Sequence, residues 1–383
     1  MIGHKSLQSS LVILDKLTTT NHLMKGTKAL RTYRFVILIL LLLFLSSCHT
    51  YKQSEQNQQA NPKSYQIDGA GKAVPERIVM GWNAFGTTDT YIEQNHVSPN
   101  LNVVSPRWLS LDSEHLITGE VDPAYVEWAH QSGKQVWVFL GNQFDPELTD
   151  KLLSDKNNHV KMAEKLEKVF VEHKIDGINV DFENIKMENK GDFVSFVQQL
   201  KKSFSPHGII VSVDITRENP DPYWSGSYDR AELGKIADYI IMMGYDEDLG
   251  AGEKVGSVAS LPWVEEGIQL LIKDVPPSKV ILAVPFYMRE WVTNLKTKKE
   301  TRYDRNMLEG DEIIKDKGLK KKWDKNVKQN YVEFVENDEK HQIWLEDKES
   351  LQQRVELVNK YDLKGTAAWF IGQETPEIWP IFH

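Results

Sequence analysis

Short apolar runs rich in β-branched residues alternate with helix-like segments from residue 77 to the C-terminus. In His159–His173, apolar side chains recur at three- and four-residue spacing opposite lysines and glutamates, which predicts an amphipathic helix. Val280–Val284 is apolar at every position, as expected for a parallel strand covered on both faces. The pattern predicts eight strands: Ile78–Trp82, Leu101–Ser105, Gln135–Leu140, Gly177–Glu183, Ile209–Ile215, Tyr239–Tyr245, Val280–Tyr287 and Thr366–Phe370.

The order of these elements predicts the fold class. Eight consecutive strand–helix units are typical of an α/β protein with a TIM-type (β/α)8 barrel, whereas six would have indicated a doubly wound sheet. Residues 292–342, between the seventh and eighth strands, are too many for a bare loop in a compact domain. We expect them to form a small subdomain inserted above the barrel mouth. A solvated, partly disordered excursion is the alternative.

The N-terminal region has the pattern of a secretion signal. Four basic residues between positions 25 and 34 precede the apolar run Phe35–Leu45, which is too short to span a bilayer comfortably. The small residues before Cys48 resemble the lipobox of bacterial lipoproteins, in which the cysteine becomes the lipid-bearing N-terminus after cleavage. We therefore expect residues 1–47 to be a signal peptide and Cys48 to be lipidated. An uncleaved membrane anchor is the alternative.

A flexible tether is predicted between this signal and the barrel. Residues 48–76 are rich in Gln, Asn, Ser and Lys and contain few large aliphatic side chains, so they bury too little apolar surface to order themselves. The barrel is expected over residues 77–383. Met24 is a natural start for the signal, which would make residues 1–23 an upstream extension.

Composition narrows the classes of function. The 383 residues are 40% hydrophobic and 26% charged, as in a globular protein. Lys and Arg total 46 against 55 Asp and Glu, a net charge of −9, so no nucleic-acid partner is expected. The single cysteine excludes a disulfide framework within the chain, and no Cys or His spacing indicates a structural zinc site. We expect no bound metal.

Polar residues alternate along the fourth predicted strand, within Asp176–Asn184. Strand side chains alternate between faces, so Asn179, Asp181 and Glu183 share one face and apolar residues the other. In a barrel the polar face points inward, and Glu183 falls at the C-terminal end, where barrel active sites form. Two carboxyl groups held this close cannot both ionise freely, so the pKa of one should rise, as a general acid requires. The alternative is an edge strand of an antiparallel sheet with its polar face in water.

The sequence contains, in chain order, the motifs Asp176-x-x-Asn179-x-Asp181-x-Glu183, Met243-x-Tyr245-Asp246 and Pro285-Phe286-Tyr287-Met288-Arg289, followed by Trp369. Together these motifs resemble those of glycoside hydrolase family 18, the chitinase-like family. The resemblance covers almost all of residues 77–383 and implies a small α+β insertion between strands seven and eight of the barrel. Within the family, Asn179 together with Leu261–Glu266 and Ile343–Asp347 resembles the spore-cortex N-acetylglucosaminidase, or sporulation-type glycosylase, branch.

The resemblance implies a substrate-assisted reaction that needs neither a metal nor an organic cofactor. Glu183 would protonate the glycosidic oxygen and later serve as base for water, while the acetamido oxygen of the substrate attacks the anomeric carbon. Asp181 would hold the acetamido N–H, and Tyr245 would hydrogen-bond the acetamido oxygen. Configuration would be retained, and the sugar would have to be N-acetylated.

Further residues are expected to bind substrate or to support the residues that do so. Asn179 stands where most chitinases of the family have Asp, and it cannot share a proton with Asp181, which should therefore stay ionised over a wider pH range. Asp214 either binds sugar hydroxyls or caps the next loop. Asp246 either contacts substrate or pairs with Arg289. Trp369 either stacks on the sugar or packs in the core. The residues of this group are Asp176, Asn179, Asp214, Asp246, Arg289 and Trp369.

These observations predict a monomeric, extracytoplasmic glycosidase, anchored to the cell membrane as a lipoprotein, that cleaves β-linked N-acetylglucosamine in a polymeric glycan. Cell-wall or spore-cortex peptidoglycan is preferred to chitin, because the closer motif resemblance points there. A chitinase or chitooligosaccharide hydrolase is one alternative. Another is a catalytically silent barrel that binds glycans as a lectin; such relatives usually lack the glutamate that is present here as Glu183.

Overall fold

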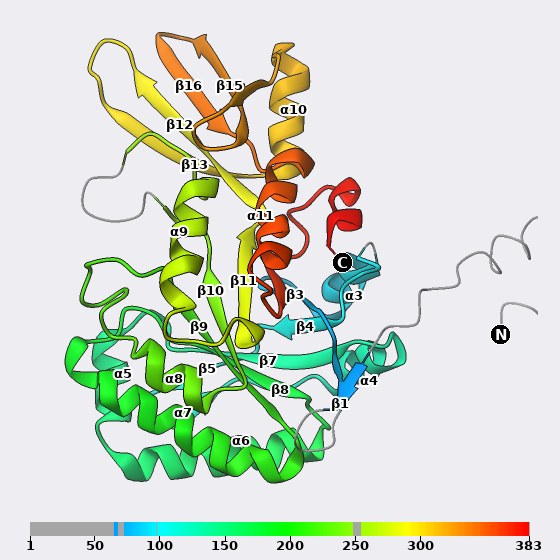
Figure 1. Cartoon of the computed structure of the whole chain (residues 1–383), viewed down its shortest axis with the longest axis vertical. Coiled ribbons are helices and arrows are strands. Elements are labelled where there is room, and N and C mark those ends of the chain that lie inside the picture. Colours follow the sequence, from blue (N-terminus) through cyan, green and yellow to red (C-terminus); the bar gives the residue numbers. More distant parts are fainter. Residues whose placement is uncertain (1–64, 68–72, 97, 248–253, 383) are drawn as a thin grey trace, which may run out of the picture. The chain divides into compact units, whose positions relative to one another are not determined.

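Eight parallel strands form a closed barrel in the computed structural model, which describes residues 65–67, 73–96, 98–247 and 254–382 (Figure 1). In order around the barrel they are β3 (Ile78–Asn83), β4 (Val103–Pro106), β7 (Gln135–Gly141), β8 (Gly177–Asp181), β9 (Ile210–Thr216), β10 (Tyr239–Met243), β11 (Val280–Pro285) and β17 (Gly365–Trp369). β3 pairs with β4 and β17, and the pairing of β4 with β7 helps to close the ring.

The TIM-type barrel is confirmed, and each predicted strand occurs in its predicted place. Three strands end two residues earlier than expected, before Glu183, Tyr245 and Tyr287, and β17 ends one residue earlier. At these points the chain leaves the sheet and enters the loops of the barrel mouth. Glu183 and Tyr245 are therefore placed by the first residues of loops that rigid strands support.

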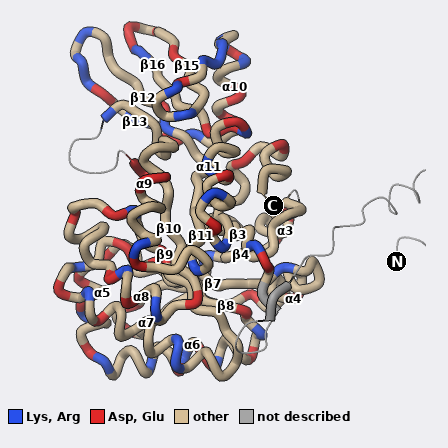
Figure 2. Tube along the Cα trace, in the orientation of Figure 1, with Lys and Arg blue, Asp and Glu red and all other residues tan. Residues whose placement is uncertain are grey.

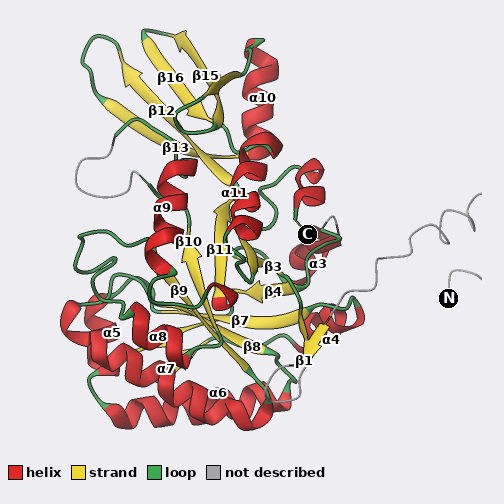
Figure 3. Cartoon of the chain, viewed as in Figure 1, coloured by secondary structure: helices red, strands yellow, loops and turns green. Residues whose placement is uncertain are grey.

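Helices cover the outside of the barrel (Figure 3). Asp122 and Asp145 each begin a helix, because their carboxylates accept hydrogen bonds from the first free backbone N–H groups and proline follows. The α-helices are α3 (Thr88–His96), α4 (Pro123–Gln131), α5 (Pro146–Leu153), α6 (Lys156–Glu172), α7 (Lys190–Phe204), α8 (Arg230–Ile236), α9 (Leu261–Leu271) and α11 (Lys348–Lys360). Short 3-10 helices are Met187–Asn189, Ser205–His207, Pro277–Lys279 and Pro376–Ile381.

The core lies between these helices and the barrel. The predicted amphipathic segment is α6, and its stripe Met162, Leu166 and Phe170 is buried. Phe170 stacks on Phe204 of α7 with ring centroids 5.4 Å apart. Burial of such faces, rather than helix propensity alone, is what holds the helices on the barrel.

An antiparallel sheet with one helix is inserted between β11 and β17. Its strands pair in the order β13-β12-β16-β15-β14, so the α+β insertion is confirmed and the alternative of a solvated excursion is wrong. It begins before residue 292, because a single residue separates its first strand from the end of β11. Its elements are β12 (Tyr287–Asn294), β13 (Glu300–Asn306), α10 (Met307–Lys317), β14 (Lys322–Asp324), β15 (Gln329–Glu336) and β16 (Glu339–Trp344).

Two short strand pairs lie outside this plan. β5 (Leu109–Asp112) runs beside β7 and pairs with β6 (Leu116–Thr118). β1 (Tyr65–Ile67) pairs with β2 (Ala73–Pro75), so regular structure begins inside the segment that was expected to be a tether. The two strands contain only two large aliphatic residues, Ile67 and Val74, and are joined by backbone pairing.

The predicted signal peptide 1–47 and the lipidation site Cys48 lie outside the described residues and stay predictions. Within the part of the chain that the structure describes, no helix has both the length and the apolar character needed to cross a bilayer. Basic and acidic residues are interspersed along the barrel helices and the insertion (Figure 2).

Candidate active site

The inward face of β8 carries the polar residues that the strand pattern predicted. Phe182, on the opposite face, stacks on Phe193 and Phe196 of α7, each with ring centroids 5.6 Å from its own. Asn179 and Asp181 therefore point into the barrel, where both are buried. The β8 pairing is parallel on both sides, which excludes an edge strand with its polar face in water.

Asn179 lies at the centre of a hydrogen-bond network inside the barrel. Its Oδ1 accepts from Nε1 of Trp82 at 2.7 Å, and its Nδ2 donates to Oδ1 of Asp214 at 2.7 Å and to Oγ of Ser212 at 3.2 Å. The amide thus joins β8 to β3 and to β9. The same amide holds the carboxyl of Asp214 inside the barrel, where this residue is 1% exposed.

Asp181 is a buried carboxyl group with an unused hydrogen-bonding atom. Its Oδ1 finds no partner among the described residues, although the side chain is only 8% exposed. Burial raises the pKa of Asp181 to about 7, against the opposing positive charge of Arg107. A buried acceptor of this kind is suited to an N–H donor from a bound ligand.

Glu183 follows β8, and the side chain of Asn142 holds its backbone in place. Its N–H donates to Oδ1 of Asn142 at 3.1 Å, and Nδ2 of Asn142 donates to its carbonyl oxygen at 2.7 Å. Burial, followed by the charges of Asp181, Asp246 and Asp214, raises the pKa of Glu183 well above its ordinary value. The sequence predicted a raised pKa for one carboxyl of the pair. The pKa values of Asp181 and Glu183 both rise, because burial of the two carboxyl groups has a larger effect than the repulsion between them.

Asp246 connects the mouth to the insertion. The hydroxyl of Tyr287 donates to its Oδ1 at 2.5 Å, and Nη2 of Arg289 donates to the same atom at 3.3 Å. Nε of Arg289 also donates to Asp304 of β13 at 3.0 Å. Of the two roles considered for Asp246, the pairing with Arg289 is therefore present. The pKa of Asp246 is raised by burial, while the hydrogen bond from Tyr287 opposes the rise.

Two aromatic residues complete the predicted set. Tyr245 lies edge-on to Tyr287 with ring centroids 6.2 Å apart, and burial raises its pKa well above the ordinary value, so its hydroxyl stays protonated. Trp369 ends β17 and lies edge-on to Trp82 at 5.7 Å. It is half-buried.

Asp176 is not brought to this site. It precedes β8, at the end of the strand opposite to Glu183, where its Oδ2 accepts from the backbone N–H of Val136 at 2.9 Å and lies 2.7 Å from Nε2 of His130. Five strand residues at about 3.3 Å each separate it from the mouth. The expectation that Asp176 belongs in or beside the substrate site is corrected: it fastens β8 to β7 and α4.

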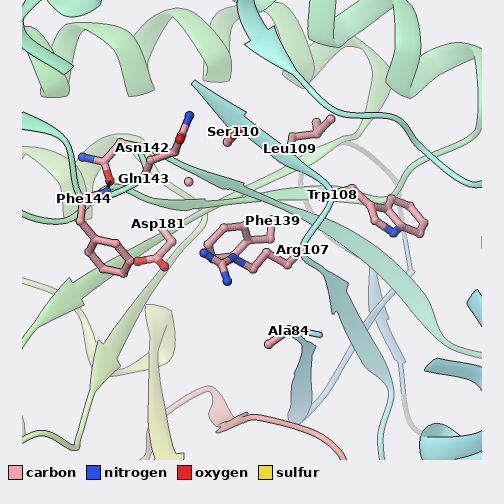
Figure 4. A pocket seen from close by; sticks show the side chains of 11 residues that line it. Ala84, Arg107, Trp108, Leu109, Ser110, Phe139, Asn142, Gln143, Phe144 and Asp181 are labelled. Carbon is pink, nitrogen blue, oxygen red and sulfur yellow. Dashed lines mark hydrogen bonds between the residues drawn. The ribbon is translucent and has the colours of Figure 1, made fainter. Parts of the chain in front are cut away.

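A cavity of about 340 Å³ opens beside Asp181 (Figure 4). Sequence reasoning missed Arg107 and Asn142, which line it and which directly follow β4 and β7. An inspection of the first polar residue after every predicted strand would have found both, because barrel sites form at these positions. In the described part of the chain, no three His, Cys, Asp or Glu side chains are grouped to hold a metal ion.

Comparison with protein families matches residues 123–374 to the family described as glycosyl hydrolases family 18. Over 319 residues the chain is 24% identical to the uncharacterized glycosylase YvbX of Bacillus subtilis (strain 168), which covers 81% of this chain and 91% of that protein. The chain spans just over half the length of the next curated relatives that it matches.

Solved structures with the same fold include two enzymes with different named roles. The spore cortex-lytic enzyme SleL of Bacillus megaterium QM B1551 superposes with a TM-score of 0.71 at 18% identity, covering 81% of this chain and 76% of that one. A chitinase from Chromobacterium violaceum ATCC 12472 superposes with a TM-score of 0.72 at 20% identity, covering 80% and 97%. At these identities the likeness shows the fold.

Proposed function

The chain belongs to glycosyl hydrolase family 18, and from this premise we propose that it is a retaining glycosidase that cleaves β-linked N-acetylglucosamine in cell-wall or spore-cortex peptidoglycan. The observation that carries the proposal is the pair at the C-terminal end of β8: the buried carboxyl of Asp181, the last residue of the strand, and Glu183, which follows the strand and whose pKa is raised well above its ordinary value. A carboxylic acid that keeps its proton near neutral pH is what a leaving glycosidic oxygen requires.

In the first step, Glu183 gives its proton to the glycosidic oxygen and the bond to the anomeric carbon breaks. The acetamido oxygen of the same sugar forms the new bond, which yields a cyclic oxazolinium ion and leaves Glu183 ionised. In the second step, Glu183 takes a proton from water as the water oxygen bonds to the anomeric carbon. The acetamido group is released unchanged, and two displacements retain the configuration.

Asp181 and Tyr245 orient the acetamido group. The unpartnered Oδ1 of Asp181 accepts the acetamido N–H, and the charge of the ionised carboxylate stabilises the oxazolinium ion. The hydroxyl of Tyr245, kept protonated by burial, donates to the acetamido oxygen. Trp369 supplies a ring face on which the sugar stacks. Each of these groups acts on an N-acetylated sugar. A sugar that lacks the acetamido group has no nucleophile for the first step.

Peptidoglycan is preferred because the resemblance to the spore-cortex branch is supported by the fold shared with a named spore cortex-lytic enzyme. The chitinase with the same fold makes chitin oligosaccharides the alternative substrate. We further propose that the enzyme works as a monomer outside the cytoplasmic membrane, lipidated at Cys48. Palmitate labelling of the wild type, absent from Cys48→Ala, tests the anchor.

The proposed function is tested by mass spectrometry of the products released from purified peptidoglycan, spore cortex and chitin oligomers. The expected result is muropeptides with N-acetylglucosamine at the new reducing end, absent with Glu183→Gln. Release from chitin alone would transfer the proposal to the chitinase alternative. Binding without release by the wild type would identify a lectin and contradict the enzymatic proposal.

A further inference from the structure

Arg107 is a cation at the barrel mouth that the proposed mechanism does not use. It directly follows β4 and lines the same cavity as Asp181. Its guanidinium carbon lies 5.6 Å from the ring centroid of Phe85 and 5.6 Å from that of Phe139. Figure 4 shows the Arg107 side chain extending past Phe139 on the side of the cavity where Asp181 lies. Two aromatic contacts thus fix the position of an exposed charge.

The guanidinium N–H donors of Arg107 have no hydrogen-bond acceptor among the described residues. Among the described residues, no carboxylate lies within ion-pair distance of it and its side chain makes no hydrogen bond, whereas Arg289 pairs with Asp246 and Asp304. Its contacts with protein are made by aromatic rings, which accept no conventional hydrogen bond. The N–H groups at the edge of the guanidinium therefore remain for a ligand that enters the cavity.

We propose that Arg107 forms a subsite for a carboxylate carried by the glycan next to the sugar that reacts. The inference rests on the proposed function and selects the substrate class: in peptidoglycan the sugars on both sides of N-acetylglucosamine bear a lactyl group, whose carboxylate is free or extended by a short peptide. Chitin bears none. A guanidinium binds a carboxylate through two parallel N–H···O bonds, which gives direction as well as attraction.

The surrounding charges make such a subsite necessary for an anionic glycan. Of the groups whose charges act on Glu183, three are acids, Asp181, Asp246 and Asp214, and the cation is Arg107. A glycan carboxylate that approached this mouth without a cation would meet groups of its own sign. Arg107 lies on the β4 side of the cavity and offsets that repulsion where a neighbouring sugar would lie.

The test compares three substrates of one length: a tetrasaccharide of alternating N-acetylglucosamine and N-acetylmuramic acid, the same compound with its carboxylates methylated, and chitotetraose. With Arg107→Gln, we expect kcat/KM on the anionic compound to fall about tenfold, mainly through KM, and to fall less on the two neutral compounds. Added salt should weaken the wild-type preference for the anionic compound and leave that of the variant unchanged.

The control is Lys168→Gln, which removes one positive charge from the exposed face of α6 and should leave all three activities unchanged. Equal losses on all three substrates with Arg107→Gln would overturn the subsite and assign Arg107 a structural role. Binding to Glu183→Gln, with and without Arg107→Gln, separates this inference from the proposed function. If the wild type hydrolyses nothing, the enzyme proposal fails, while binding of the anionic compound that depends on Arg107 still supports the subsite; binding that does not depend on it overturns the subsite.

Discussion

Two groups of charged side chains are buried in this molecule, and the chain accommodates them in opposite ways. Glu346 and Arg354, each 0% exposed, form an ion pair beneath the insertion. Nε2 of Gln329 donates to Glu346 at 2.7 Å, and Nη1 of Arg354 donates to the carbonyl of Ala259 at 2.9 Å. At the barrel mouth, by contrast, the buried Asp181 has an unpartnered oxygen and carboxyl groups for neighbours.

The comparison shows that one fold uses buried ionisable groups both to hold segments of the chain together and to perform chemistry. The pair beneath the insertion neutralises itself and fastens β16 and α11 to the loop before α9. The mouth acids have too little countercharge, so the pKa values of Asp181, Glu183 and Asp214 rise instead. Removing a partner should therefore damage stability in the first group and reactivity in the second.

The largest effect is expected from Glu183→Gln, which keeps the shape of the side chain and removes its proton-transfer role. Hydrolysis should fall about 10³-fold or more in kcat, because the amide of glutamine cannot give a proton to the leaving oxygen. The dissociation constant for a glycan should change little. Steady-state kinetics and calorimetry measure the two effects, and an unaltered kcat would remove Glu183 from the mechanism.

The second effect concerns the paired group. Arg354→Met should lower the free energy of unfolding by about 3–5 kcal/mol, because it leaves the Glu346 carboxylate buried without its cation. The double variant Arg354→Met with Glu346→Leu should recover most of that loss. Urea denaturation followed by tryptophan fluorescence measures both. A single variant as stable as the wild type would show that the pair does not fasten the insertion.

The third effect is a pH dependence of stability. The pKa of Asp181 rises from an unfolded value near 4 to about 7, so the folded state binds this proton more tightly than the unfolded state. The free energy of unfolding should therefore fall as pH rises from about 4 to about 7, by an amount on the order of a few kcal/mol. Asp181→Asn should flatten this slope in urea titrations. Parallel curves for both proteins would mean that Asp181 titrates normally.

The smallest effect is expected at Asn179. Asn179→Asp replaces the amide that donates to Asp214 with a further acid, so the pKa of Asp181 should rise further. Activity should persist, while the acid limb of the kcat/KM profile moves to higher pH by about one unit. An unchanged profile would show that position 179 does not tune Asp181.

The barrel was predictable because each strand carries its own signal. Runs such as Val280–Val284 are apolar on both faces, and the alternation around Asp181 shows which side chains face inward. Each pattern lies within a single segment of the sequence. This is expected in a barrel, since each strand–helix unit must bury its own apolar faces. The inward-facing pair on β8 was predictable for the same reason.

Contacts between distant segments were not predictable. Asn142 clamps the backbone of Glu183 from 41 residues away, and nothing in its own sequence neighbourhood indicates this role. The buried pair of Glu346 and Arg354 is joined to Ala259, 95 residues from Arg354. Asp176 was misplaced for the converse reason: closeness in a sequence motif does not mean closeness in space when a strand runs between its members.

The central claim is that burial keeps Glu183 protonated at neutral pH, and its most direct test is the titration of that carboxyl group itself. Carboxyl carbon NMR of protein labelled with 13C-glutamate identifies its resonance as the one missing from Glu183→Gln. The account predicts a midpoint well above the ordinary glutamate value of about 4.3. A midpoint at that ordinary value would contradict the account, since an ionised Glu183 has no proton to give.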